Sequence, residues 1–191
     1  MPDHFVGRTD RSPKGISYRM SATNTKSMPL FGFISIVDLG DATWIGGYLL
    51  LNSLGRPVEF HCSEPVKANR AQQILYGETL PAFVCSEQIG RALVDNSQLK
   101  PTLIMTDQEA ALALRELTGI PVAWLAAEVP SNVRAGLVSV TLGDSVAFIE
   151  EQNANDQLPL QEALEQVMSK WDLQEPFERI REAVSELQKA A

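Results

Sequence analysis

WIGGYLLLNSLGRPVEFHCSEPVKANR, residues 44–70, is the stretch of sequence that decides the fold. An apolar run at Tyr48–Leu51 and a second strand-like run at Arg56–Cys62 flank the segment Asn52–Gly55. Asparagine favours the first position of a turn, and glycine supplies the positive φ that closes a hairpin. The stretch therefore predicts two antiparallel strands joined by a tight turn.

Side chains alternate along the second of these strands, so it has two distinct faces. We expect one face to be buried and the other to be polar or to line a cleft. The buried face would hold Val58, Phe60 and Cys62, and the polar face Glu59, His61 and Ser63. The first strand contains Gly46 and Gly47, and glycines within a strand indicate a bulge or the close approach of another segment. We favour the bulge, because it is the commoner cause.

A candidate binding site follows the second strand. The strand ends at Pro65, which cannot donate to a ladder, and Asn69 is a suitable N-cap for a short helix that Gly77 would end. Cationic side chains and the free N–H groups of a helix start suit an anion. We therefore predict a ligand-binding pocket made by Glu59, His61, Lys67, Asn69 and Arg70. The competing interpretation is a solvated strand end with ordinary caps.

The remaining strands define the fold class. Leu30–Leu39 precedes the hairpin and completes an antiparallel meander, and Leu137–Leu142 alternates as an edge strand would. Strands at Thr102–Met105 and Pro121–Leu125 flank a helix for which Thr106 and Glu109 would form a capping box. A βαβ unit of this kind has parallel strands. The predicted fold is α/β, with α+β as the alternative: a mixed sheet with an antiparallel meander plus a βαβ unit, and helices packed on it.

Helices are predicted at three further places. Pro81–Asn96 has proline in its first turn and an apolar stripe. Leu160–Trp171 and a final helix after Asp172 would form a C-terminal helical hairpin. The apolar residues of the final helix recur at a three-four spacing. This spacing suits internal packing, which we favour, or a seam between two copies of the chain.

Composition sets the broad class. The chain has 191 residues, a hydrophobic fraction of 45% and a formal net charge of −8. This charge makes nucleic acid an unlikely partner, because phosphates attract a basic surface. Two cysteines without a pairing pattern fit a reducing compartment, and no stretch has the length of a membrane span or the form of a secretory signal, so we expect a cytoplasmic protein. We expect a flexible polar tail at residues 1–27, a mixed-sheet core at 28–150 and the helical hairpin at 158–191.

Known chemical motifs are absent from the sequence. The two histidines, His4 and His61, have no metal-ligand spacing, and no glycine-rich nucleotide motif follows a strand, so we predict no metal and no cofactor. Cys62 is better explained as a small core residue than as a nucleophile, because His61 points to the opposite face of the strand.

Residues 55–77, GRPVEFHCSEPVKANRAQQILYG, are similar to a stretch found in uncharacterised bacterial proteins, for which no activity is known. The order of hairpin, helix, strand, helix and strand also resembles the zinc nucleoside deaminases, without their zinc motifs. We therefore expect a non-enzymatic binding or interaction module. The alternatives are an enzyme that uses His61 as acid/base with Lys67 and Arg70 holding an anionic substrate, and a deaminase-like fold that has lost its zinc.

Overall fold

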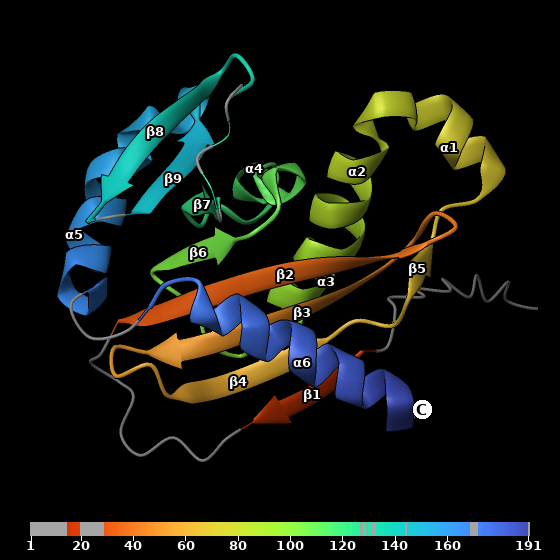
Figure 1. Cartoon of the computed structure of the whole chain (residues 1–191), viewed down its shortest axis with the longest axis horizontal. Coiled ribbons are helices and arrows are strands. Elements are labelled where there is room, and N and C mark those ends of the chain that lie inside the picture. The colour runs from red at the N-terminus through yellow and green to blue at the C-terminus, as the bar shows by residue number, and fades with distance from the viewer. Residues whose placement is uncertain are drawn as a thin grey trace, which may run out of the picture.

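The computed structural model describes residues 15–19, 29–126, 128, 130, 133–143, 145–168 and 172–190. In these ranges nine strands form a single mixed sheet, with the order β1-β4-β3-β2-β6-β7-β9-β8 and with β5 paired to β3 (Figure 1). The strands are β1 (Ile16–Arg19), β2 (Leu30–Gly40), β3 (Thr43–Asn52), β4 (Pro57–Cys62), β5 (Val66–Lys67), β6 (Leu103–Thr106), β7 (Val122–Leu125), β8 (Leu137–Leu142) and β9 (Ser145–Glu150).

Helices cover both faces of this sheet. They are α1 (Arg70–Tyr76), α2 (Leu80–Ala82), α3 (Arg91–Asn96), α4 (Leu114–Thr118), α5 (Gln157–Met168) and α6 (Glu175–Ala190). A π-helical segment, η2 (Phe83–Gly90), joins α2 to α3, and 3-10 turns occur at η1 (Gly77–Thr79), η3 (Glu109–Ala111) and η4 (Glu151–Asp156). No helix within these ranges combines the length and apolar character that crossing a membrane requires.

The predicted α/β fold with a mixed sheet is confirmed. β2, β3 and β4 form the antiparallel meander, and β6 and β7 are parallel to each other. β6 also pairs in parallel with β2, which joins the two halves of the sheet. The chain leaves β2 through β3 and β4 on one side, and passes through β6 and β7 on the other. The strand order therefore changes direction between β2 and β6.

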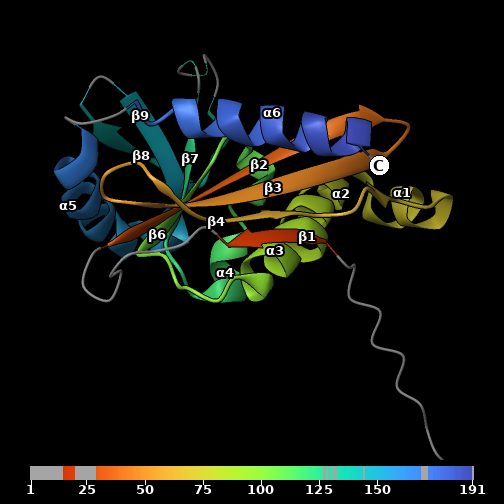
Figure 2. The ribbon, with the colours of Figure 1, turned by 90° about the horizontal axis from the view of Figure 1, so that it is seen from below.

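The two faces of the sheet carry separate cores. One contains apolar side chains of α5 and α6, and the other contains those of η2, α3 and α4. Figure 2 shows α6 on one side of the strands and α2, α3 and α4 on the opposite side. The two C-terminal helices follow one another in sequence and contact different parts of the sheet: α5 packs on β8, whereas α6 crosses β2 and β3.

The hairpin between β3 and β4 forms as the sequence predicts. Asn52 Oδ1 accepts hydrogen bonds from the backbone N–H groups of Leu54 and Arg56, at 2.9 and 3.1 Å, and Gly55 has a φ of +71°. The register shifts between Leu50 and Leu51. Because of this bulge, Val58 points to the same face of the sheet as Glu59 and belongs to the core on that face. Phe60 and Cys62 point to the opposite face and belong to the core beneath α6. The predicted alternation is therefore wrong at Val58, and the face of Glu59 and His61, which we expected to be polar or to line a cleft, is buried as well.

Gly46 and Gly47 have a different role from the bulge that we favoured. The register of β2 and β3 is regular through both residues, from Ile34 opposite Tyr48 onwards. A Cβ at Gly46 would overlap Ile89 of η2, and a Cβ at Gly47 would overlap Ile180 of α6. The two glycines thus allow helices to approach the same point of β3 from opposite faces.

Two predicted helix boundaries have different outcomes. Asn69 caps α1 with a full capping box: its side chain accepts from Gln72 N–H, and Gln72 Oε1 accepts from Asn69 N–H, each at 2.9 Å. The capping box predicted at Thr106 is wrong. Thr106 Oγ1 instead accepts from Gln108 N–H at 3.1 Å, and the helix that we expected is divided into η3 and α4. The hydroxyl stabilises a turn directly after β6 and does not start a helix.

Part of the predicted N-terminal tail is a strand. Residues 16–19 form β1 and pair antiparallel with β4. Polar composition does not reveal this pairing, because the pairing uses backbone groups. The edge of β4 offers N–H and C=O groups that an extended segment of any composition can bind. Residues 1–14 and 20–28 lie outside the described ranges.

Replacing either glycine of β3 by alanine should destabilise the protein. Alanine normally stabilises a strand relative to glycine by about 0.5–1 kcal/mol, but here each methyl group would overlap a packed isoleucine. We expect Gly46→Ala and Gly47→Ala to lower the free energy of unfolding by about 1–3 kcal/mol, measured by urea denaturation. Leu54→Ala, at an exposed turn position, is the control. Glycine variants as stable as the wild type would show that the helices can move away at no cost.

Candidate functional site

The five residues predicted to form a pocket lie in three separate places. Glu59 and His61 are buried side by side on β4, on the face covered by α3. Lys67 pairs with Asp41 at the exposed β2–β3 turn. Asn69 is used in the cap of α1. Arg70 is exposed, and its guanidinium donates to Gln73 at 3.4 Å. The structure therefore brings together only Glu59 and His61.

Glu59 is the centre of a buried polar cluster. Its Oε2 accepts hydrogen bonds from Ser97 Oγ at 2.7 Å and from the backbone N–H of Gln98 at 3.2 Å. His61 Nε2 lies 3.2 Å from the same oxygen. The His61 ring also stacks on Tyr48, with 6.1 Å between the ring centroids. These contacts hold the loop after α3 to β4.

Burial prevents this cluster from meeting a substrate. Tyr48, Glu59 and His61 are all at least 97% buried. The Tyr48 ring occupies the space above Gly32, where a Cβ would lie 2.8 Å from it. Burial alone would raise the pKa of Glu59, but hydrogen bonds from Ser97, His61 and Gln98 outweigh it and hold this pKa below its ordinary value. A carboxylate kept ionised in this way is a structural anchor.

A second polar cluster lies at the carboxyl end of β6, beside the middle of β2. Ser35 Oγ, on β2, donates to Asp107 Oδ2 at 2.7 Å, and Nη1 of Arg181, on α6, donates to the same oxygen at 2.6 Å. Asp107 follows β6 directly. In open α/β sheets, ligands bind beyond the carboxyl ends of the strands where the strand order changes direction. β2 and β6 are the strands between which that change occurs.

Asp107 is partly accessible, and it is not fully satisfied. Its side chain is 15% exposed and that of Arg181 is 46% exposed, whereas Ser35 is buried. Asp107 Oδ1 is buried and has no hydrogen-bond partner among the described residues. A group approaching from solvent would thus meet the Arg181 guanidinium first, with the Asp107 carboxyl and then Ser35 behind it.

The electrostatics of Asp107 are opposite to those of Glu59. Burial raises the pKa of Asp107 above its ordinary value, although the Ser35 hydrogen bond and the Arg181 charge oppose the rise. Cys85, in η2, lies within reach of the same charges. Burial, together with the negative charges of Asp107 and Asp38, raises the pKa of its thiol to about 12. Cys85 is therefore a neutral thiol at pH 7 and not a nucleophile.

A hollow of about 540 Å³ lies near the carboxyl end of β6, between the residues that follow this strand and α2. Its lining includes Gln108 and Glu109, which directly follow Asp107, and Arg134, which bridges Glu109 and Glu150 at 2.6 and 2.5 Å. Within the described ranges, no three His, Cys, Asp or Glu side chains gather in a metal-binding arrangement.

A partial signal for this site is present in the sequence. An aspartate directly after a buried strand such as TLIM is well placed for a site at the end of a sheet, although the prediction made at this point was a helix cap at Thr106. Ser35 and Arg181 carry no local signal, because one lies within an apolar strand and the other on the polar side of an amphipathic helix.

No protein-family model and no curated protein matches the chain. Among solved structures, it is similar to that of a variant of Endonuclease V from Ciona intestinalis, in complex with a 23mer DNA containing an inosine followed by a ribo-adenosine. The TM-score is 0.49 and the identity 10%, over 87% of this chain and 88% of that chain. This likeness assigns neither an activity nor a ligand to the present chain.

Two sequence-based predictions are corrected at this point. We expected a non-enzymatic binding or interaction module, and we expected nucleic acid not to be a partner. The similar structure is that of an enzyme in complex with DNA, and neither prediction is retained. The alternative with His61 as acid/base is not retained either, because His61 is buried and neither Lys67 nor Arg70 reaches it.

Asp107→Asn should stabilise the protein at neutral pH. The raised pKa means that the folded state holds a proton that the unfolded chain has released, so stability is lost as the pH rises from about 4 through the folded pKa. Asparagine does not ionise, so the variant does not lose stability in this way. Arg181 loses its carboxylate partner in the variant, but its half-exposed guanidinium remains hydrated. We expect the free energy of unfolding of the variant, measured by urea denaturation, to exceed that of the wild type by on the order of 1 kcal/mol at pH 7. This difference should disappear near pH 3.5. The exposed Asp95→Asn is the control; a less stable Asp107→Asn would contradict this assignment.

Glu59→Gln should have the opposite effect. The folded pKa of Glu59 is lowered, so its contribution is present above the unfolded pKa of about 4.3 and is lost as the pH falls through the folded value. At pH 7 we expect the free energy of unfolding of the variant to be about 2–3 kcal/mol lower than that of the wild type. The difference should narrow at acid pH. Equal losses at pH 7 and pH 3 would show that the charge of Glu59 plays no part. Glu64→Gln, an exposed neighbour, controls for net charge.

Proposed function

We propose that this chain is a hydrolytic enzyme in which the Asp107 carboxyl is the general base and general acid. One observation carries the proposal: a carboxyl with a raised pKa and an unsatisfied oxygen stands at the point where the strand order reverses, paired with a half-exposed arginine. Groups with pKa values displaced towards neutrality are typical of acid–base catalysts, because they can both take and give a proton at neutral pH.

Each residue of the cluster has a distinct role in this proposal. The Asp107 carboxylate removes a proton from water, and the water oxygen then attacks the electrophilic centre of the substrate. The protonated carboxyl returns the proton to the leaving oxygen, which restores the carboxylate. Arg181, as the exposed cation beside Asp107, stabilises the negative charge that develops on the substrate oxygens. Ser35 is a positioning residue: its hydroxyl fixes Oδ2, and the unpaired Oδ1 is the oxygen that takes the proton once Arg181 turns from Asp107 to the substrate.

The chemistry fits a phosphate or carboxylate ester. Both reactions pass through a transition state with added negative charge on oxygen, which a guanidinium stabilises with two parallel N–H groups. Arg181 would then exchange part of its bond with Asp107 for a bond with the substrate. Losing this counter-charge raises the pKa of Asp107 further, since a nearby positive charge favours the ionised carboxylate.

Hydrolysis of a small substrate panel tests this proposal. The panel consists of p-nitrophenyl phosphate, bis-p-nitrophenyl phosphate, p-nitrophenyl acetate, and labelled single- and double-stranded DNA and RNA, each with and without Mg²⁺. We expect turnover of at least one substrate, and a fall of about 10²–10⁴-fold in kcat for Asp107→Asn. Asp95→Asn should retain full activity.

The pH profile separates a catalytic role from a structural one. For the substrate that is turned over, kcat/KM should rise with pH through the pKa of Asp107, and Arg181→Gln should move this inflection to higher pH. No turnover on any member of the panel, or equal activity of Asp107→Asn and wild type, would reject the proposal.

A further inference from the structure

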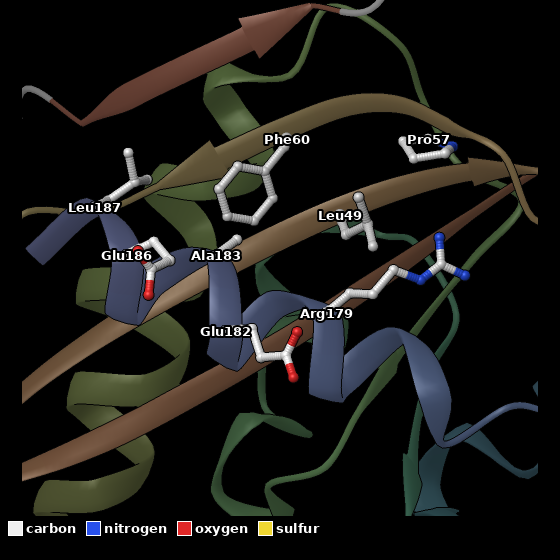
Figure 3. A pocket seen from close by; sticks show the side chains of 8 residues that line it. All are labelled: Leu49, Pro57, Phe60, Arg179, Glu182, Ala183, Glu186 and Leu187. Carbon is white, nitrogen blue, oxygen red and sulfur yellow. The ribbon is translucent and has the colours of Figure 1, made fainter.

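A groove of about 550 Å³ runs between α6 and the strands β3 and β4. Its lining consists of Leu49, Pro57, Phe60, Arg179, Glu182, Ala183, Glu186 and Leu187. Figure 3 shows Leu187 and Glu186 toward one end of the groove, and Arg179 and Pro57 toward the other. The groove lies along the side of α6 where the helix, crossing β2 and β3, runs next to β4.

The groove is apolar where an occupant would insert. Leu49 and Phe60 form the floor and belong to the core beneath α6. Ala183 and Leu187 form the helical wall and are only partly buried. The same wall therefore has apolar atoms in contact with water. Covering such surface is favourable by roughly 25 cal/mol for each Å² removed from water.

Charge at the rim distinguishes between occupants. Arg179 is neutralised, because its guanidinium binds Glu175 at 2.5–2.8 Å and Gly55 O at 3.3 Å. Glu182 has no ion pair in the described part of the chain. Among the described residues Glu186 pairs with Lys189 alone, and both side chains are largely exposed, at 74% and 67%, so this pair contributes little. The groove thus offers two carboxylates over an apolar floor.

We infer that this groove binds a basic amphipathic helix of a partner protein. Large apolar side chains at i and i+4 of that helix would contact Leu49, Phe60 and Leu187, and lysine or arginine beside them would pair with Glu182 and Glu186. Binding of an apolar helix face in a hydrophobic groove is a recurring mode of peptide recognition. The inference is independent of the proposed hydrolysis, because it uses none of Ser35, Asp107 and Arg181.

Two probe peptides test the inference on the full chain. Both have about 16 residues, roughly four turns of helix, and the same leucine face; one has lysine and the other glutamate at the flanking positions. We expect fluorescence anisotropy to give a Kd of about 1–100 µM for the lysine peptide, and at least tenfold weaker binding for the glutamate peptide. In ¹⁵N spectra, the amide shifts should be confined to the groove residues of β3, β4 and α6.

Matched variants locate the contact. Glu182→Lys combined with Glu186→Lys should raise the Kd of the lysine peptide at least tenfold. Leu187→Asp should have the same effect, because it places a charge in the apolar wall of the groove. Glu162→Lys combined with Glu165→Lys changes net charge equally on exposed positions of α5 and should leave Kd within twofold.

Three outcomes would overturn the inference. Equal weakening by both charge-reversed pairs would mean attraction to net charge alone. No binding of the lysine peptide below millimolar concentration would mean that the groove is not a helix site. Sedimentation showing self-association that Leu187→Asp abolishes would mean that a second copy of the chain occupies the groove.

Discussion

The packing of two isoleucines against the same point of β3 is the constraint on which the rest of the structure depends. Ile89 contacts the strand at Gly46 from one face, and Ile180 contacts it at Gly47 from the other. Neither contact is compatible with a Cβ on the strand. The two glycines therefore set how closely both helical layers approach the sheet. Through that spacing, Arg181 lies one residue beyond a fixed contact of α6 and can reach Asp107.

Local signals in the sequence account for most of the fold that was predicted. The Asn52–Gly55 turn, the cap at Asn69 and the parallel strands β6 and β7 depend on residues close in sequence, so turn and capping chemistry reveals them. The π-helical segment η2 and the pairing of β1 do not follow from such signals. The first needs the packing of the whole helix, and the second needs the edge of a strand far along the chain.

The candidate site was harder to predict, for a geometric reason. Ser35 and Arg181 lie 72 and 74 positions from Asp107, and only the order of the strands and the crossing of α6 bring the three together. The predicted pocket used residues near in sequence. His61 points into the core beneath α3, whereas Lys67 and Arg70 follow the chain out of the sheet to the exposed turn and to α1. Proximity in sequence therefore misplaced the basic groups.

The π-helical segment also has a consequence for the phase of the helix that contains it. A π-helical turn holds more residues than an α-helical turn, so side chains after it face a direction that an uninterrupted α-helix would not give them. Cys85 and Ser86 within this segment, and Leu93 after it, all face inward. Ser86 hydroxyl donates to Ala110 O, and Leu93 lies against β3 near Gly46. Deleting one residue here would restore an ordinary helix and rotate everything beyond it by about 100°, which would remove Leu93 from the sheet. The extra residue thus works as a spacer that lets one helix satisfy two differently oriented neighbours.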